Sequence, residues 1–554
     1  NGDTATAPTD VISAESKTNV YTSNNGTTVV EISTANSHGL SHNKFYEYNV
    51  TDKGVVLNNT VSSGTTHASE LAGSVPANQY SNKLADIILN EVITTNQSEL
   101  SGYTEVVGKN ADVIIANPNG ITCNGCGFIN TNKVSLTTGN PLIDGTGKLN
   151  GFEVNQGNIH FGRQGADLTN QEKFNIVARG VSIDGNIVMD KDDGNTPNGT
   201  LNVIAGTNEW DHETDAVTEK TADADSPSYA IDSTVFGGIQ AGQITFKATE
   251  DGVGVKVLAN AAASADDFII TADGTIEINS KIKSARDVII DAASNAAELI
   301  ISGDESGISA DEDIIITASN TDVTLNDSTI VAESNIEIES NRFTDDNSGE
   351  AQRISTSGSV KIKANDDVST SNSIWKVENG DFELEGERNI TSDNLKVGSS
   401  SFSLKSTGGD ISLTDSIIES ENDILIESTT SNINLERSSG TDEDSSFVKS
   451  ISGDLAIDAG DNLTNNIIIA TQGGSIDIKA EVFDNNNQIQ SNDDILIDFE
   501  TLNNNNTEIT SLSNLTFTGT TANLDGEVKA SGNIDIDLTD ALSLNIIQSN
   551  QNIT

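Results

Sequence analysis

Two cysteines, Cys123 and Cys126, are three positions apart and are the only cysteines in the 554-residue chain. A structural zinc site needs four ligands, and none of the five histidines is paired near another cysteine, which argues against zinc. A thioredoxin-like redox pair needs a helix start, whereas Gly125 and Gly127 lie in a β-rich context. A local disulfide or two thiols remain open, and an oxidising compartment favours the disulfide.

The tetrad Asn117-Pro118-Asn119-Gly120 precedes these cysteines and has turn chemistry at every position. Proline fixes φ at the first central position of a turn, and Asn or Gly accepts positive φ at the next. Taken alone, these residues predict a type I or II turn that joins two coils of a β-helix.

Catalytic motifs are not evident elsewhere in the chain. With 84 Asp and Glu residues, any pair of carboxylates is uninformative. We find no GxSxG elbow, no HExxH pair and no phosphate-binding glycine loop. The Asp-rich turns lack the tandem nonapeptide of calcium-binding β-rolls, so we expect weak calcium binding at most. The sequence predicts a protein that is not an enzyme and has neither a metal site nor a cofactor.

The charge balance excludes further classes of function. The chain has 29 basic and 84 acidic residues and a net charge of −55. Nucleic acid and anionic lipid headgroups would repel it. No apolar run approaches the ~20 residues that span a bilayer, so we expect no membrane insertion. The chain opens NGDTATAPTD without a starting Met or a signal peptide, and we interpret it as a processed or trimmed fragment.

A repeated sequence pattern from residue 264 onward indicates the architecture that positions the tetrad and the two cysteines. A small polar turn is followed by a short strand of alternating apolar residues, at intervals of about 22 residues. A lone strand of this kind cannot bury its apolar face, but stacked coils close an apolar column. The fold predicted by this repeat is an all-β parallel β-helix. Its first apolar residues are Phe268, Val288, Ile314, Ile336, Val360, Phe382, Ile411, Ile424, Leu455, Ile476, Ile495, Leu515 and Ile534.

Irregular features interrupt this pattern. The spacing slips on either side of Ile411. Residues 80–92 have an alternative helical periodicity, too short to change the fold class. The Asn runs at 485–488 and 503–506 are expected to fill tight turns, because Asn tolerates left-handed backbone. The acidic, Pro-containing stretches at 191–200 and 208–228 are expected to form a variable surface loop.

The first half of the chain resembles the secretion domain of two-partner secretion exoproteins, the family of filamentous haemagglutinin and contact-dependent growth inhibition proteins. The resemblance covers most of residues 20–257. Its pieces appear in family order: GLSHNKFYEYNVTDKGVVLNN (39–59), LADIILNEV (84–92), VVGKNADVIIANPNGITCNGCGFINT (106–131), VSLTTGNPLID (134–144), GFEVNQGNIHF (151–161), LNVIAGTN (201–208) and YAIDSTVFGGIQAGQITFKATEDGVGV (229–255).

This resemblance implies that the β-helix is right-handed and has an N-terminal cap and a few extra-helical strands or hairpins. It also implies export as an unfolded chain, recognition by the periplasmic POTRA domains of a TpsB-type outer-membrane transporter, and passage through that barrel. It makes Asn117-Pro118-Asn119-Gly120 a motif for secretion or partner recognition. Haemagglutinin-type members also carry an earlier Asn-Pro-Asn-Leu motif. Here its place reads Pro76-Ala77-Asn78-Gln79, a degenerate form that leaves the role of the first site open.

The sequence therefore predicts a secretion domain over residues 1–257 and a β-helical shaft over residues 258–554. We expect a secreted or cell-surface exoprotein of a Gram-negative bacterium, which acts as an adhesin or presents a distal effector. Its expected partners are the transporter and a receptor or glycan on a host or neighbouring cell. A haemolysin or cytolysin of the same family is the alternative, and a polysaccharide-active β-helix enzyme is a third.

Overall fold

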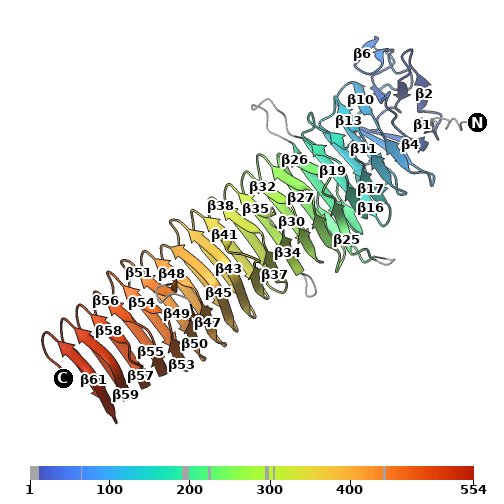
Figure 1. Ribbon diagram of the computed structural model, residues 1–554. Helices are drawn as coiled ribbons and strands as arrows, with labels where there is room; N and C mark the ends of the chain where they lie inside the picture. Colours follow the sequence, from blue (N-terminus) through green and yellow to red (C-terminus); the bar gives the residue numbers. More distant parts are fainter. Residues whose placement is uncertain are drawn as a thin grey trace, which may run out of the picture. The chain divides into compact units, whose positions relative to one another are not determined.

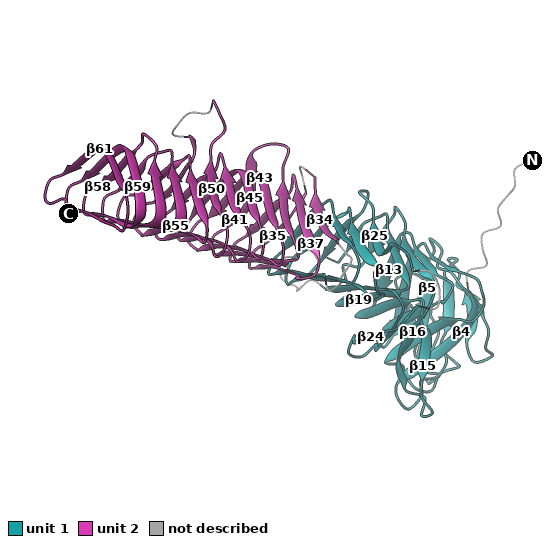
Figure 2. Cartoon of the chain, turned by 90° about the horizontal axis from the view of Figure 1, so that it is seen from below, with its two compact units in different colours: residues 1–297 teal, residues 298–554 magenta. Residues whose placement is uncertain are grey.

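The computed structural model describes residues 11–63, 65–189, 199–222, 226–292, 298–303, 306–440 and 445–554. The chain divides into two compact units, residues 1–297 and residues 298–554 (Figure 2). The described residues form strands, turns and bends without an α-helix. No helix in these ranges is long and apolar enough to cross a membrane. The domain boundary predicted at 257/258 stays a prediction.

Unit 2 is a stack of three-strand coils (Figure 1). One coil consists of β36 (Ile314–Ala318), β37 (Asp322–Asn326) and β38 (Thr329–Ala332). The next consists of β39 (Ile336–Ser340), β40 (Phe343–Asp346) and β41 (Ala351–Thr356). Each strand of the first coil pairs in parallel with the strand three places later. Where two strands merge into one, as in β43 (Val368–Val377), the long strand pairs in parallel with both β40 and β41. Because equivalent strands pair in every coil, the predicted parallel β-helix is confirmed.

The apolar column in unit 2 follows the predicted strand starts, with one correction. Phe402 of β46 (Phe402–Ser406), and not Ile411, pairs with Phe382 and Ile424. Ile411 starts β47 (Ile411–Thr414) on the next sheet and pairs with Ile390. Both strands alternate, so spacing alone assigned Ile411 to the wrong sheet. The complete column is Ile314, Ile336, Val360, Phe382, Phe402, Ile424, Leu455, Ile476, Ile495, Leu515 and Ile534.

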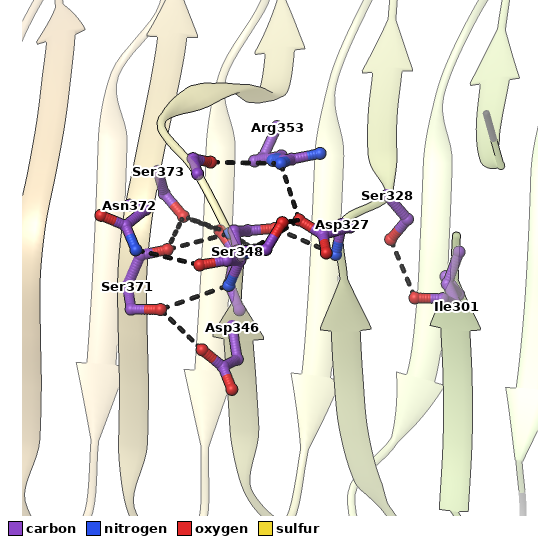
Figure 3. Close-up of polar contacts among 12 residues, drawn as sticks. Ile301, Asp327, Ser328, Asp346, Ser348, Arg353, Ser371, Asn372 and Ser373 are labelled. Atoms are coloured by element: carbon purple, nitrogen blue, oxygen red, sulfur yellow. Dashed lines mark hydrogen bonds and ion pairs between the residues drawn. The ribbon is translucent and has the colours of Figure 1, made fainter. Parts of the chain in front are cut away.

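Left-handed residues shape the corners of unit 2. Asp327 and Asn372 have φ values of 50° and 53°. The Asp327 carboxylate accepts hydrogen bonds from the Ser348 amide (2.9 Å), the Ser348 hydroxyl (3.0 Å) and the Arg353 guanidinium (3.0 Å) (Figure 3). Asn372 donates its amide to the carbonyl of Asn347 (2.9 Å). Asp and Asn suit these corners because their short side chains stabilise left-handed backbone by local hydrogen bonds.

The start of unit 1 is a cap, as the resemblance implies. β1 (Val11–Ser13) pairs antiparallel with β4 (Leu40–Tyr48), and β2 (Asn19–Thr22) pairs antiparallel with β3 (Thr28–Glu31). β3 then pairs in parallel with β5 (Val55–Asn59), where the coil pattern begins. These antiparallel strands cover the first edge of the parallel stack, an edge that would otherwise pair with other chains.

An extra-helical sheet of four antiparallel strands is part of unit 1. It consists of β15 (Asn140–Ile143), β16 (Leu149–Val154), β23 (Asn208–Trp210) and β24 (Val217–Glu219). Its Phe152 and Trp210 stack at 5.7 Å and share one core cluster with Leu89, Val177 and Ile204. The sheet therefore buries the outward face of the β-helix at these residues. This explains why strands such as β11 (Asp112–Ala116), of sequence DVIIA, do not alternate: both of their faces are covered.

Two sequence expectations differ from the structure of unit 1. The helical alternative at residues 80–92 is wrong, because β8 (Ile87–Val92) is a strand paired with β4 and β11. The stretch 208–228 was expected to be loop, but it contains β23 and β24, paired to each other and to β16. In the other acidic stretch, residues 191–198 lie outside the described residues.

Candidate functional site

The Asn117–Gly120 turn forms a corner within one coil in unit 1. It joins β11 to β12 (Ile121–Cys123). β12 pairs in parallel with β9 (Ser98–Leu100) of the previous coil and with β17 (Asn158–Phe161) of the next. The turn is thus stacked between two other corners, and β11 and β17 are labelled in Figure 1. The prediction that the turn joins two coils is wrong, because β11 and β12 both pair with strands of the previous coil, β8 and β9.

Asn117 is fully buried and holds this corner to the coil before it. Its side-chain amide donates hydrogen bonds to the carbonyl of Asn96 (2.9 Å) and the hydroxyl of Ser98 (3.0 Å). Its side-chain oxygen accepts a hydrogen bond from the Asn119 amide (3.0 Å), which closes an Asx turn. Because both polar atoms of this side chain are hydrogen-bonded, Asn117 fixes the corner to the previous coil in the folded protein.

The rest of the tetrad continues the same stacking. Asn119 donates its side-chain amide to the carbonyl of Thr94 (2.6 Å). The Pro118 carbonyl accepts a hydrogen bond from the Gln156 side chain (3.2 Å). Gly120 has φ +119°, and a Cβ atom there would lie 3.0 Å from the carbonyl oxygen of Asn158. Glycine is required because this backbone is left-handed and the next coil passes close to it.

Cys123 and Cys126 form a disulfide across the following corner. Cys123 ends β12, Cys126 starts β13 (Cys126–Ile129), and both side chains are buried. Between them, Gly125 has φ +93°. The loop closed by the bond is short, so the disulfide fixes only this corner. No group of three or more His, Cys, Asp or Glu able to hold a metal occurs in the described part of the chain.

A tyrosine ties the disulfide corner to its neighbours. The ring of Tyr103, at the start of β10 (Tyr103–Gly108), lies against Gly127, where a Cβ atom would come within 2.4 Å of it. The Tyr103 hydroxyl donates a hydrogen bond to the Asp167 carboxylate (2.7 Å) on β18 (Ala166–Asp167). This hydrogen bond, together with burial and the Asp167 charge, raises the pKa of Tyr103 to about 12. Three successive coils are thereby joined.

The degenerate tetrad, Pro76-Ala77-Asn78-Gln79, does not have the burial pattern of Asn117–Gly120. Pro76 and Gln79 are exposed, whereas Ala77 and Asn78 are buried. Asn78 donates its side-chain amide to the carbonyls of Ile32 (2.8 Å) and Asn58 (3.0 Å). Its side-chain oxygen accepts a hydrogen bond from the Tyr80 amide (2.8 Å). Asn78 therefore makes the same kinds of hydrogen bond as Asn117, although Asn78 is the third residue of its tetrad and Asn117 is the first residue of its own.

The two tetrads are not brought together into one site. In the described structure, Asn78 and Asn117 have no hydrogen-bond partner in common. Asn117 is instead held by the coil before it, and Asn78 by Ile32 of the coil before it and by Asn58 of its own coil. The polar side-chain atoms of both asparagines are already hydrogen-bonded. The chemical role of these two side chains is therefore to hold neighbouring backbone segments in place.

Sequence reasoning missed the partners of these asparagines and a buried carboxylate nearby. Ser98 was not singled out, although it lies 19 residues before Asn117, about one coil. The Glu105 carboxylate is buried and accepts hydrogen bonds from the Ser69 hydroxyl and the amides of Glu70 and Leu71. It fastens the hairpin of β6 (His67–Ser69) and β7 (Gly73–Val75). A search for polar residues one coil apart would have found Ser98, but no pattern marks Glu105.

Comparison with known proteins identifies relatives of unit 1. A family model described as the TPS secretion domain matches residues 6–278. The crystal structure of the filamentous hemagglutinin secretion domain matches with a TM-score of 0.50 and 32% identity, covering 56% of this chain and 100% of that chain.

Longer relatives match over about half of the chain. The tRNA nuclease CdiA of Yersinia mollaretii is 38% identical over 270 residues, or 49% of this chain and 9% of that protein. Filamentous hemagglutinin of Bordetella pertussis is 36% identical over 267 residues, or 48% of this chain and 7% of that protein. The matches span less than a tenth of these relatives' lengths. The resemblance inferred from the sequence motifs is confirmed.

Proposed function

The chain belongs to the family of two-partner secretion exoproteins, and on this premise we propose that POTRA domains of a dedicated outer-membrane transporter bind its N-terminal region in the periplasm. The family is one of secreted or cell-surface exoproteins of Gram-negative bacteria, which places this chain outside the cell. The observation that carries the proposal is the match of residues 6–278 to the secretion domain, together with full coverage of a solved example.

The fold suits export as an unfolded chain. A parallel β-helix is quasi-one-dimensional, so each coil can fold on the one before it without waiting for the far end. The only disulfide closes a loop with two residues between its cysteines, too small to obstruct passage. No proline follows Pro227, so the remaining chain carries no slow X-Pro isomerisation. Folding outside the cell would then favour outward movement.

Unit 2 is proposed to act as a shaft. It either binds a receptor or glycan on another cell or presents a distal effector. We propose no catalytic site in this chain, and the toxin and nuclease activities in the relatives' names are not assigned to it. The alternative within the family is a cytolysin. Release of haemoglobin from erythrocytes by the exported protein would favour that alternative, and adhesion to cells without lysis would favour the shaft.

The test of the export proposal is co-expression of the full chain with and without its cognate transporter in Gram-negative cells. With the transporter, the protein is expected in the medium or on the cell surface. Without it, the protein is expected to remain in the periplasm. Equal amounts outside the cell in both strains would overturn the proposal. Binding of the urea-unfolded chain to purified POTRA domains, with refolded chain as the comparison, tests the recognition step.

A further inference from the structure

Two adjacent apolar residues of unit 1, Val235 and Phe236, are strongly exposed. They lie in the corner between β25 (Tyr229–Ser233) and β26 (Gly238–Ala241), both labelled in Figure 1. Each side chain is 66% exposed, and no other large apolar side chain in the described residues is as exposed. Single exposed apolar residues are common in proteins, but corners usually carry polar residues. The presence of two large apolar side chains in this corner therefore needs an explanation.

The fold does not require apolar side chains in this corner. The two coils before it have corners at residues 162–165 and 184–186, and the strands on either side of all three corners pair in register. The first of these corners carries the exposed residues Arg163 and Gln164, and the second reads Asp-Gly-Asn. Polar residues thus occupy the stacked corners of two preceding coils, so the fold accepts them there.

The backbone holds the corner in place. The Gly237 amide donates a hydrogen bond to the Thr234 carbonyl (3.2 Å), which closes the turn, and the Thr234 amide donates one to the previous coil (2.9 Å). The Phe236 ring lies beneath the guanidinium of Arg163, 4.8 Å from the ring centroid. An exposed contact of this kind contributes little to stability. Polar replacements of Val235 and Phe236 should therefore leave the fold intact.

The same residues form a distinct pattern when the chain is extended. Alternate side chains of an extended chain point to opposite faces. Val235 then has the small residues Ser233 and Gly237 on its own face, and Phe236 is likewise flanked by Thr and Gly. Residues 233–246 carry no charged side chain, although 20% of the chain is charged. A partner that adds this segment to the edge of its own sheet gains backbone hydrogen bonds and can take each large side chain into a pocket.

We infer that Val235 and Phe236 are a recognition element for the POTRA domains of the transporter, which bind them while residues 229–241 are still extended. This inference rests on the proposed export through a dedicated transporter and names a contact for it. The element lies within residues 6–278, the part of the chain that matches the TPS secretion domain. When the corner folds, the turn replaces the extended backbone, so folding releases the contact.

The test is a double variant, Val235→Ser with Phe236→Ser, in the full chain co-expressed with the cognate transporter. We expect its initial rate of appearance outside the cell, measured by pulse labelling, to fall about tenfold, as when anchor side chains are removed from an interface. Binding of the urea-unfolded chain to purified POTRA domains should weaken by a similar factor. The urea midpoint of the refolded chain should stay unchanged, because neither side chain belongs to the core.

Two control variants separate recognition of this element from other effects. Leu512→Ser removes an apolar side chain that is 55% exposed but lies in unit 2, outside the matched domain, and should be exported at the wild-type rate. Arg163→Gln removes the guanidinium from the folded corner and leaves residues 233–246 unchanged, so it should also be exported at the wild-type rate. The wild-type chain with and without the transporter tests the proposed function itself.

Each outcome supports or rejects a stated part of the proposal. Export of the double variant at the wild-type rate would overturn the inference. Equal slowing in Leu512→Ser would also overturn it, because apolar surface anywhere would then matter. Equal slowing in Arg163→Gln would show that the folded corner is recognised, and a lower urea midpoint of the double variant would show that the fold requires these side chains. If the wild-type chain leaves the cell without the transporter, the proposed function fails, whatever the variants do.

Discussion

At the scale of single residues, the asparagines of this chain perform two different tasks. In the run 503–506, Asn504 is buried in a ladder with Asn485, whereas Asn506 is exposed and has φ +58°. The expectation that Asn runs fill tight turns is right for Asn506. It is wrong for Asn485 and Asn504, which lie in strands β55 (Ile476–Asn485) and β57 (Ile495–Asn504). Composition alone does not distinguish a corner from the end of a strand.

Asn506 offers a test of the corner assignment. Asn506→Gly should keep or slightly raise the free energy of unfolding, because Gly adopts positive φ without strain. Asn506→Val should lower it by about 1–2 kcal/mol, the cost of a left-handed β-branched residue. Urea unfolding of the purified chain measures both. Similar values for the two variants would show that the backbone at this position is not left-handed.

At the scale of elements, the hairpin of β23 and β24 is the main feature that the repeat did not predict. Its turn is anchored to the β-helix by ion pairs of Asp215 with Lys133 (3.7 Å) and Lys173. Lys133 also donates a hydrogen bond to the carbonyl of His212. Long-range docking of this kind leaves no periodic signal, because its partners come from separate coils.

His212 in this turn makes the hairpin sensitive to acid. Burial and the neighbouring Lys133 hold the pKa of His212 below its usual value of 6.5, against the opposing charges of Glu213 and Asp211. Below pH 6.5 the unfolded turn takes up a proton more readily than the folded one. The contribution of His212 to stability is therefore complete above pH 6.5 and is lost as pH falls further.

We expect amide protection in β23 and β24 to decrease between pH 7.5 and 5.5 by hydrogen exchange corrected for intrinsic rates. The decrease should be smaller in His212→Gln, which has no titrating ring. Strands of unit 2 measured in the same sample provide the internal control. An identical loss of protection in the variant would assign the effect to another group.

At the scale of the whole molecule, the net charge of −55 is the dominant physical property. Lysines on the strands reduce this repulsion where they pair with acids of the adjacent coil. Examples are Lys405 with Glu427 (3.1 Å) and Lys449 with Glu419 (3.4 Å). Exposed pairs of this kind contribute little each, so most of the repulsion between distant carboxylates is left to the solvent to screen.

Stability should therefore increase with ionic strength. The Debye length falls from ~30 Å at 0.01 M salt to ~8 Å at 0.15 M, which removes much of the long-range repulsion between carboxylates. We expect the urea midpoint to rise over this range of NaCl at pH 7.5. The rise should be smaller near the sequence pI of about 4.1, where many carboxylates are protonated. A midpoint that falls with NaCl would mean that ion pairs outweigh repulsion.

The sequence by itself determined the parallel β-helix. Alternation fixes which side chains of a strand point inward, and a lone strand of that pattern is stable only in a stack. It also determined the family, because long motifs occur in order. These are properties of neighbouring residues along the chain.

Only the tertiary structure decided which sheet each strand joins and which corners are held by buried side-chain hydrogen bonds. Phe402 and Ile411 both begin alternating strands, and only pairing assigns Phe402 to the column of Phe382. Likewise, only the bonds to Ile32 and Asn58 identify Asn78 as the counterpart of Asn117. The physical reason is the same in both cases. Hydrogen bonds between coils join residues about 20 or more positions apart, and local composition does not encode their partners.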